Sequence, residues 1–311
     1  MAQVRVVAAL TACFVVALFV PNIALRRMPT LWTWVQTADD GSDLAVLGAL
    51  RTADAEDVDI VVLGSSLAVV DVSALMVERE TGRSVLNAGV LAMPLIASSM
   101  YVGEVLALRP STVVLVTGPR AFGDLILPDE TPFDWGIAIS ALPASAWMRS
   151  DVLSAALADA SDAYRLRTVP RLAWDGTLAE REISASDRHR ADDARFARLA
   201  RRRGQEVVDT PTVVDGPASR AVGTLIDRCT DQGVNVLLVA APVHSALLRT
   251  PGVWFHPPHL AELRRIAELH GAAVLIPDNE GLWRDSDFRD PLHLAPAGQR
   301  RFSQAVAVEL R

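Results

Sequence analysis

The sequence contains no lysine and only two cysteines, and each shortage excludes a class of chemistry. All 30 basic residues are arginine, so no lysine is present to form a Schiff base, act as a nucleophile or bind phosphate in a P-loop. Cys13 lies in an apolar N-terminal segment and Cys229 in an expected helix, and we do not expect them to pair. The sequence therefore predicts no disulfide framework, no cysteine-rich zinc site and no cofactor.

Basic charge is also in short supply. The 30 basic residues stand against 37 acidic ones, which gives a net charge of −7. Nucleic-acid binding needs a basic face, so this balance argues against nucleic acid as a main partner. The chain has 311 residues, 50% of them hydrophobic, which suits one large α/β domain with an appendage or two small domains.

A long apolar run lies near the N-terminus. Residues 6–20 are interrupted only by Thr11, and the run extends to Leu25, about the 20 residues that a membrane-spanning helix requires. A cleaved signal peptide is the alternative, but the small-residue pattern expected before a cleavage site is weak. Arginines at both ends argue against a buried core helix, and their balance leaves the orientation open. We predict an uncleaved transmembrane anchor at 4–25, followed by a linker at 26–50.

The rest of the chain, 51–311, alternates expected strands and helices. Its first strand lies in Val58–Leu67, a branched apolar run that suits a strand buried on both faces. A helix at 72–80 with Asp71 as its N-cap should follow. Such an order predicts right-handed crossovers and a parallel sheet. The later expected elements are strands at 84–86, 112–116, 235–239 and 273–276 and helices at 94–108, 218–232, 259–270 and 296–310.

The segment at about 121–216 breaks this rhythm and is predicted to be an insertion. It holds several prolines, three tryptophans and a charged stretch from about Glu180 to Arg203. The charged stretch is typical of a solvated helix face, and a lid or a partner-docking element is the alternative.

Polar residues follow the expected strands and recur in the last loop. Gly64-Ser65-Ser66 follows the first strand, Asn87-Ala88-Gly89 the second and Gly118-Pro119-Arg120 the third, and Asp290 and His293 precede the last helix. Parallel strands bring their carboxyl ends to one edge of a sheet, where ligands bind in open α/β folds. An ordinary polar turn is the alternative for the first of these motifs.

These residue types form a coherent catalytic set. A serine is a weak nucleophile until a base removes its proton, and His293 is suited to that near neutral pH. Asp290 would fix the imidazole tautomer and stabilise its charged form. The N–H groups of Ser66 and Gly89 would face the oxyanion that develops during acyl transfer.

The sequence resembles the SGNH (GDSL-like) hydrolase superfamily. Leu63-Gly64-Ser65-Ser66-Leu67 is similar to its first block with Ser66 as nucleophile, Asn87-Ala88-Gly89 to its second, and Asp290-x-x-His293 to its last. The resemblance implies a three-layer α/β/α, flavodoxin-like sandwich and a serine hydrolase with the catalytic residues Ser66, Asp290 and His293.

The third block departs from the family pattern. The family places an asparagine there, whose side chain donates to the oxyanion, and this chain has Arg120. A guanidinium is able to donate to the oxyanion or to bind an anionic part of the substrate. The predicted oxyanion hole therefore comprises Ser66, Gly89 and Arg120. Ser65, Asn87, His244 and Trp254 are weaker candidates for substrate contacts.

The first block of the superfamily reads Gly-Asp-Ser-Leu, and Ser65 stands here in the position of its aspartate. A serine at this position together with an N-terminal anchor is similar to one branch of the superfamily. That branch includes the D-alanine transfer protein of teichoic acid synthesis and polysaccharide O-acetylation proteins. The resemblance implies an extracytoplasmic esterase or O-acyltransferase acting on a cell-envelope glycan or its acyl donor, beside a multi-spanning membrane acyltransferase. The alternative is an inactive module that binds a glycan or such a partner.

Overall fold

The computed structural model describes residues 43–123, 127, 131–160, 212–248, 256–277 and 283–311. The predicted anchor at 4–25, the charged stretch at about 180–203 and Trp254 lie outside these residues. Within the described ranges, no helix is long and apolar enough to cross a membrane.

The described chain is a mixed α/β fold around one parallel sheet of five strands. The sheet order is β2-β1-β3-β4-β5, and every neighbouring pair is parallel. This order is that of flavodoxin-like folds, in which the chain reverses its direction of winding between β1 and β3. The strands are β1 (Ile60–Gly64), β2 (Val85–Asn87), β3 (Thr112–Thr117), β4 (Asn235–Ala240) and β5 (Ala273–Leu275).

The central strands are apolar because both faces of the sheet are covered. Every residue of β1 and β3 is buried, and alternate residues belong to two different cores. Val61 and Leu63 face the larger core, while Ile60 and Val62 face the smaller one. Two helical layers therefore enclose the sheet, as the predicted α/β/α sandwich requires.

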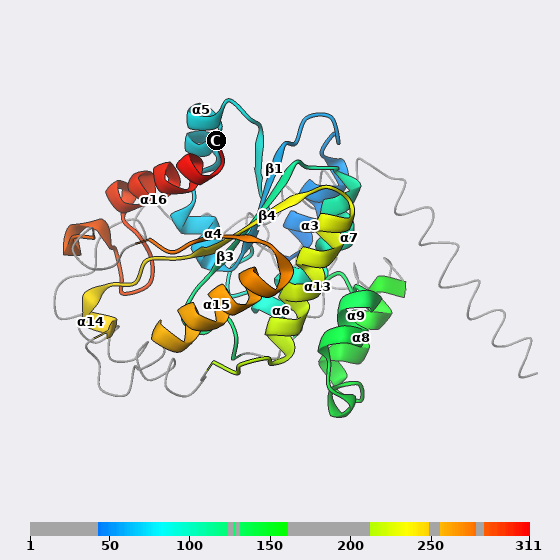
Figure 1. The fold of residues 1–311 in the computed structure, drawn as a ribbon. Helices are drawn as coiled ribbons and strands as arrows, with labels where there is room; N and C mark the ends of the chain where they lie inside the picture. Colours follow the sequence, from blue (N-terminus) through cyan, green and yellow to red (C-terminus); the bar gives the residue numbers. More distant parts are fainter. Residues whose placement is uncertain (1–42, 124–126, 128–130, 161–211, 249–255, 278–282) are drawn as a thin grey trace, which may run out of the picture.

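The smaller core lies under α4 (Ser66–Asp71), α5 (Ala74–Thr81) and α16 (Pro296–Glu309). Figure 1 shows α5 and α16 together on one side of the sheet. The predicted helix at 72–80 is corrected here. The N-cap of α5 is Ser73, whose hydroxyl accepts from the Met76 N–H, and Asp71 is instead the buried last residue of α4.

The larger core lies under the helices of the opposite face, which include α3, α7 and α13 on the other side of the sheet in Figure 1. The predicted helix at 94–108 is two helices that meet at Tyr101. The helices here are α3 (Asp43–Thr52), α6 (Leu95–Met100), α7 (Val102–Ala107), α13 (Pro217–Asp231) and α15 (His256–His270).

Two of the predicted boundaries change with this core. Val46, Leu47 and Leu50 of α3 are buried in it, so the domain already includes the end of the stretch expected as a linker at 26–50. The first part of the expected insertion also packs here, through α8 (Trp135–Ala141) and α9 (Ser150–Ala160). The short elements of the fold are α14 (Ser245–Leu248) and the 3-10 helices Ala144–Ala146 and Asp285–Asp287.

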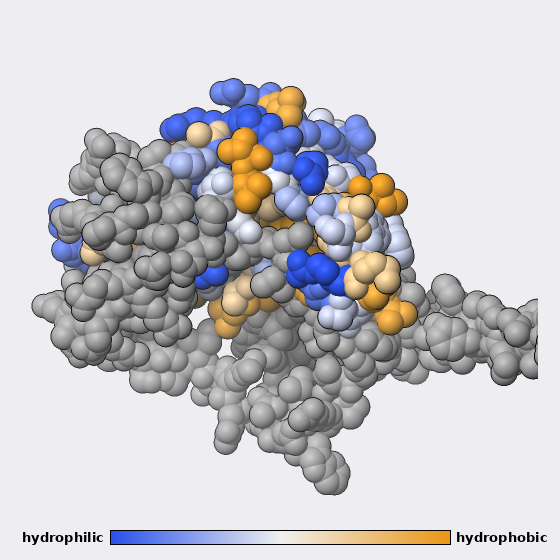
Figure 2. Space-filling view, turned by 90° about the horizontal axis from the view of Figure 1, so that it is seen from below, coloured by the Kyte–Doolittle hydropathy of each residue, from blue (hydrophilic) through white to orange (hydrophobic). Residues whose placement is uncertain are grey.

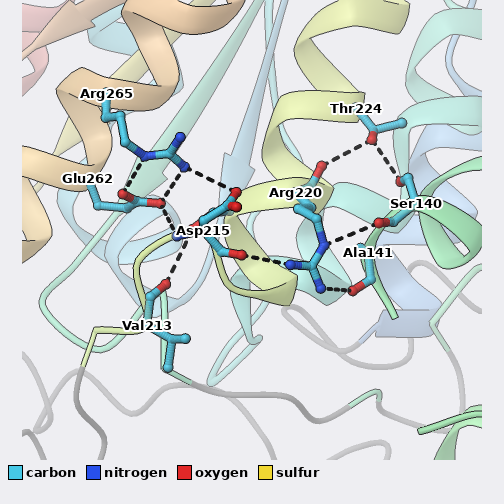
Figure 3. A network of polar contacts seen from close by, with 9 residues as sticks. Ser140, Ala141, Val213, Asp215, Arg220, Thr224, Glu262 and Arg265 are labelled. Atoms are coloured by element: carbon cyan, nitrogen blue, oxygen red, sulfur yellow. Dashed lines mark hydrogen bonds and ion pairs between the residues drawn. The ribbon is translucent and has the colours of Figure 1, made fainter. Parts of the chain in front are cut away.

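A polar network joins α8, α13 and α15 on this side (Figure 3). The Arg220 guanidinium donates to the carbonyl oxygens of Ser140 and Ala141 at 3.2 and 2.9 Å. The buried Glu262 accepts two hydrogen bonds from Arg265 and one from the Asp215 N–H. Burial alone would raise the pKa of Glu262, but these donors lower it below its usual value. The network therefore fixes the start of α13 with satisfied charges.

Figure 2 shows one face of the molecule, on which hydrophobic residues form small patches between hydrophilic ones. Scattered apolar side chains are normal on a protein surface. We assign no role to this face.

Candidate active site

The turn after β1 is built for one geometry. Gly64 has a φ of +143°, and a Cβ there would lie 2.5 Å from the carbonyl oxygen of Val116 on the neighbouring strand. Only glycine fits this close approach without strain. Ser65 follows as the N-cap of α4, and its hydroxyl accepts a hydrogen bond from the Leu67 N–H at 3.4 Å. Ser66 thus becomes the first residue of a helix at the carboxyl edge of the sheet.

The structure brings Ser66, His293 and Asp290 together. His293 Nε2 lies 2.9 Å from Ser66 Oγ, and His293 Nδ1 lies 2.8 Å from Asp290 Oδ2. A carboxylate only accepts hydrogen bonds, so Nδ1 carries the proton and Nε2 is left to accept from the serine hydroxyl. This is the arrangement in which a histidine removes the proton of a nucleophilic serine.

Asp290 is held in its ionised form. Burial would raise its pKa, but the hydrogen bond and charge of His293 and the backbone donors outweigh burial, and the pKa is lowered. The donors are the N–H groups of Leu292 and His293, which reach Asp290 Oδ1 at 2.9 and 3.0 Å. Both oxygens of the Asp290 carboxylate are therefore bound within the Asp290-x-x-His293 segment, Oδ1 by backbone N–H groups and Oδ2 by the His293 ring. These bonds fix the orientation of the ring.

A cavity of about 220 Å³ opens beside Ser66. Ser65, Ser66 and His293 contribute its polar side, and Arg120 also lines it. Its apolar lining comes from α4, the segment after β2, the end of β3 with the turn after it, and the loop at 289–294 that carries Asp290 and His293 (the catalytic loop): Leu67, Ala92, Met93, Pro94, Leu95, Val116, Ala121 and Leu292. The strand ends that form the site flank the reversal point between β1 and β3, where ligands bind in this fold class.

The predicted oxyanion donors are placed unequally. The Ser66 N–H is at the first position of α4, where a helix offers no internal acceptor. The Gly89 N–H donates to the Asn87 side-chain oxygen at 3.0 Å, and neither residue lines the cavity. In this arrangement the Gly89 donor is engaged, so its predicted part in the oxyanion hole requires a rearrangement of Asn87.

Asn87 has a clear structural task instead of a substrate contact. Its Nδ2 donates to the carbonyl oxygen of Ala68, within α4, at 2.8 Å and to that of Val72, the C-cap of α4, at 3.1 Å. One amide thus joins the end of β2 to α4.

His244 is buried behind the catalytic loop and does not line the cavity. Its N–H donates to the Pro291 carbonyl oxygen at 3.2 Å, and its Nδ1 accepts from the Ala246 N–H at 2.9 Å. Its ring also stands edge-on to Phe288 at 5.1 Å. The predicted substrate contact of His244 is therefore replaced by support of the loop.

Asp71 belongs to the site although no motif of the sequence includes it. Its side chain is 0% exposed, and its Oδ1 accepts from the N–H of Leu294, the neighbour of His293, at 2.8 Å. An acidic residue before an expected helix is typical of an N-cap, so the pattern did not separate the two roles. Leu292 and Met93, which line the cavity, had no sequence signal of their own.

Comparison with known proteins shows remote structural likeness only. No family model matches the chain, and no curated protein matches it by sequence. Among solved structures, a protein assigned to the lipolytic G-D-S-L family from Desulfitobacterium hafniense DCB-2 is 9% identical, with a TM-score of 0.37, and covers 80% of this chain and 98% of its own. TesA is 12% identical, with a TM-score of 0.41, and the match covers 81% of this chain and 97% of TesA. A mutant of Axe2, an acetyl-xylooligosaccharide esterase from Geobacillus, is 11% identical, with a TM-score of 0.44 and coverage of 81% and 93%.

Proposed function

We propose that this protein is a serine esterase that forms an acyl intermediate on Ser66. The observation that carries the proposal is the continuous hydrogen-bonded series from Ser66 Oγ through His293 to Asp290, at 2.9 and 2.8 Å. Ser66 and His293 line a cavity at the carboxyl edge of a parallel sheet.

The chemistry follows from these contacts. Ser66 Oγ attacks the ester carbonyl while His293 Nε2 takes its proton, and Asp290 stabilises the resulting imidazolium. The Ser66 N–H donates to the oxyanion, with Arg120 as the proposed second donor. His293 then returns the proton to the leaving alcohol. Water repeats the sequence on the acyl-serine and releases the acid.

The size of the cavity favours a short acyl group. Its volume of about 220 Å³ lies below the roughly 300–1,000 Å³ of pockets for drug-sized ligands. Leu292 and Met93 give it apolar walls. We therefore expect p-nitrophenyl acetate to be hydrolysed with a higher kcat/KM than p-nitrophenyl decanoate.

The decisive experiment is covalent labelling with a fluorophosphonate, which reacts with activated serines. We expect labelling of the full chain at Ser66 and its loss in Ser66→Ala. Ser65→Ala is the matched control, because its hydroxyl caps α4 one residue away and should leave most of the labelling intact. Labelling that survives in Ser66→Ala and disappears in Ser65→Ala would show that the assigned nucleophile is wrong.

The finer proposal is transfer of the acyl group to a cell-envelope glycan by an anchored, extracytoplasmic domain, with a multi-spanning acyltransferase as partner. It rests on the apolar run at 4–25 and on the family resemblance of the motifs. Carbonate extraction should leave the protein in the membrane pellet, and a periplasmic reporter fused after the domain should be active. Cytoplasmic reporter activity would refute the envelope substrate without touching the esterase chemistry.

The engaged Gly89 N–H favours one alternative, a binding module without turnover. In that case the labelling would be absent while a short acylated sugar still binds. Binding that is equal in the parent and in Ser66→Ala, with no hydrolysis in either, would support this alternative.

A further inference from the structure

The helix that carries the nucleophile ends in a second buried carboxyl group. Asp71 is the last residue of α4, five positions after Ser66, and its side chain is completely buried. One oxygen, Oδ1, accepts from the Leu294 N–H at 2.8 Å, whereas Oδ2 has no hydrogen-bond partner within the described part of the chain. A buried carboxyl oxygen without a donor is costly, so the position calls for an explanation.

Asp71 joins the two halves of the site. It shares a short helix with Ser66, and its hydrogen bond reaches the residue next to His293. Two further bonds fasten the same end of the helix to α16. Gln299 donates to the Val70 carbonyl oxygen at 2.6 Å, and the Ser303 hydroxyl accepts from the Ser73 N–H at 2.9 Å.

Among the residues that the structure describes, the charges that act on Asp71 come from the catalytic loop. They are His293, Asp290 and Arg289. The neighbouring strands β1 and β3 contain no ionisable residue, and α16 presents the neutral Gln299 and Ser303 to this end of α4. Burial raises the pKa of Asp71 to about 7, against the opposing attraction of His293 and the Leu294 hydrogen bond. The interaction between Asp71 and His293 is reciprocal, because each charge stabilises the other.

We propose that Asp71 is a positioning residue of this site, which fixes the nucleophile helix against the His293 loop and, when ionised, stabilises the protonated imidazole that forms as Ser66 attacks. Asp290 also stabilises the protonated imidazole, from within the catalytic loop, so two carboxylates act on the His293 ring. The part that concerns catalysis rests on the proposed esterase function. The part that concerns the coupling of Asp71 to His293 does not.

The test uses Asp71→Asn, which keeps an acceptor for the Leu294 N–H and removes the charge. Asp57→Asn is the matched control, because it removes the same charge from an exposed residue before β1. In the full chain, the ring protons of His293 are followed by NMR against pH. Hydrolysis of p-nitrophenyl acetate is measured over the same range.

We expect the His293 ring signals to respond at a lower pH in Asp71→Asn than in the parent, because the loss of a nearby negative charge disfavours the imidazolium, and to match the parent in Asp57→Asn. At pH 8, kcat should fall roughly tenfold while KM changes less than twofold, because the stabilised species forms only during the reaction. Equal His293 titrations in both variants would overturn the proposal. A shifted titration in a protein that hydrolyses no ester would refute the esterase and leave the coupling intact.

If Asp71→Asn does not fold, the parent protein still decides the matter. The carboxyl carbon of Asp71 and the ring protons of His293 are followed by NMR in the same pH titration. If the two groups are coupled, the His293 signals should move at the pH at which the Asp71 carboxyl titrates. His293 signals that do not respond to the Asp71 titration would overturn the proposal.

Discussion

Asp71→Asn should change how stability depends on pH, and the size of the effect follows from burial. The pKa of Asp71 is raised from 3.8 to about 7 in the folded protein. Between these values the unfolded chain has lost the proton and the folded chain keeps it. The contribution of Asp71 to stability is therefore complete below pH 4 and is lost as the pH rises through 7. The difference of about three between the folded and unfolded pKa values corresponds to about 4 kcal/mol of unfolding free energy. Asp71 is fully buried, so solvent does not screen this contribution.

The assay is urea unfolding of the parent and of Asp71→Asn at several pH values from 4.5 to 8. The buried asparagine amide carries its own cost, but that cost does not depend on pH. The difference in unfolding free energy, variant minus parent, should therefore rise by up to about 4 kcal/mol across this range. Asp59→Asn is the control that should stay nearly flat. Hydrogen bonds from Ser84 lower the pKa of Asp59, so its carboxyl is ionised in both the folded and the unfolded chain above about pH 4.5, and the same difference should change little across this range. A difference for Asp71→Asn that is flat with pH would refute the reasoning.

The remaining predictions concern the site and its supports. Arg120→Ala should lower kcat by roughly two to three orders of magnitude with a smaller change in KM. Arg120→Lys should restore little of the lost kcat, because a point charge does not replace a planar donor. Unchanged kinetics in Arg120→Ala would place Arg120 outside the mechanism. Gly64→Ala should cost about 3 kcal/mol in urea unfolding, because a Cβ meets the Val116 carbonyl, whereas Gly82→Ala, where φ is +69° and the space is open, should cost about 1 kcal/mol. Asn87→Ala removes two bonds to α4 and one from Gly89, and should lower the unfolding free energy by about 2 kcal/mol; a loss below a tenth of this would contradict the assigned support of α4.

The parallel sheet was predictable because its strands are short apolar runs bounded by glycine or polar residues. Each run had to be buried on both faces, and the strands at 60–64 and 112–117 follow that pattern closely. Asp290 and His293 were recognisable from their place before the last helix and from the resemblance of Asp290-x-x-His293 to the last block of the SGNH pattern, and the contact between them forms locally.

The nucleophile helix was not predictable in the same way. Its six residues, Ser66–Asp71, contain two valines and favour a strand or a turn by local propensity. Packing between β3 and α16, together with the Asn87 amide, makes it a helix. The split of the expected helix at Tyr101 had only a weak local signal, because Gly103 two residues later lowers helix propensity without fixing where a helix ends.

Whether the Gly89 N–H is available to an oxyanion was not predictable from the sequence. Its position after β2 was apparent from the motif, but the direction of one side-chain amide decides whether its N–H is available. Such a choice depends on the carbonyl oxygens of α4 that Asn87 meets in three dimensions.

The contact between Ser66 and His293 joins residues 227 positions apart in the chain. A pairing of such large sequence separation carries a high loop-closure entropy and forms late when a chain folds. During refolding, reactivity towards a fluorophosphonate should therefore return with the slowest kinetic phase, after the helices regain their circular dichroism. If so, the reactivity of Ser66 would report on completed folding more directly than any spectroscopic signal of secondary structure.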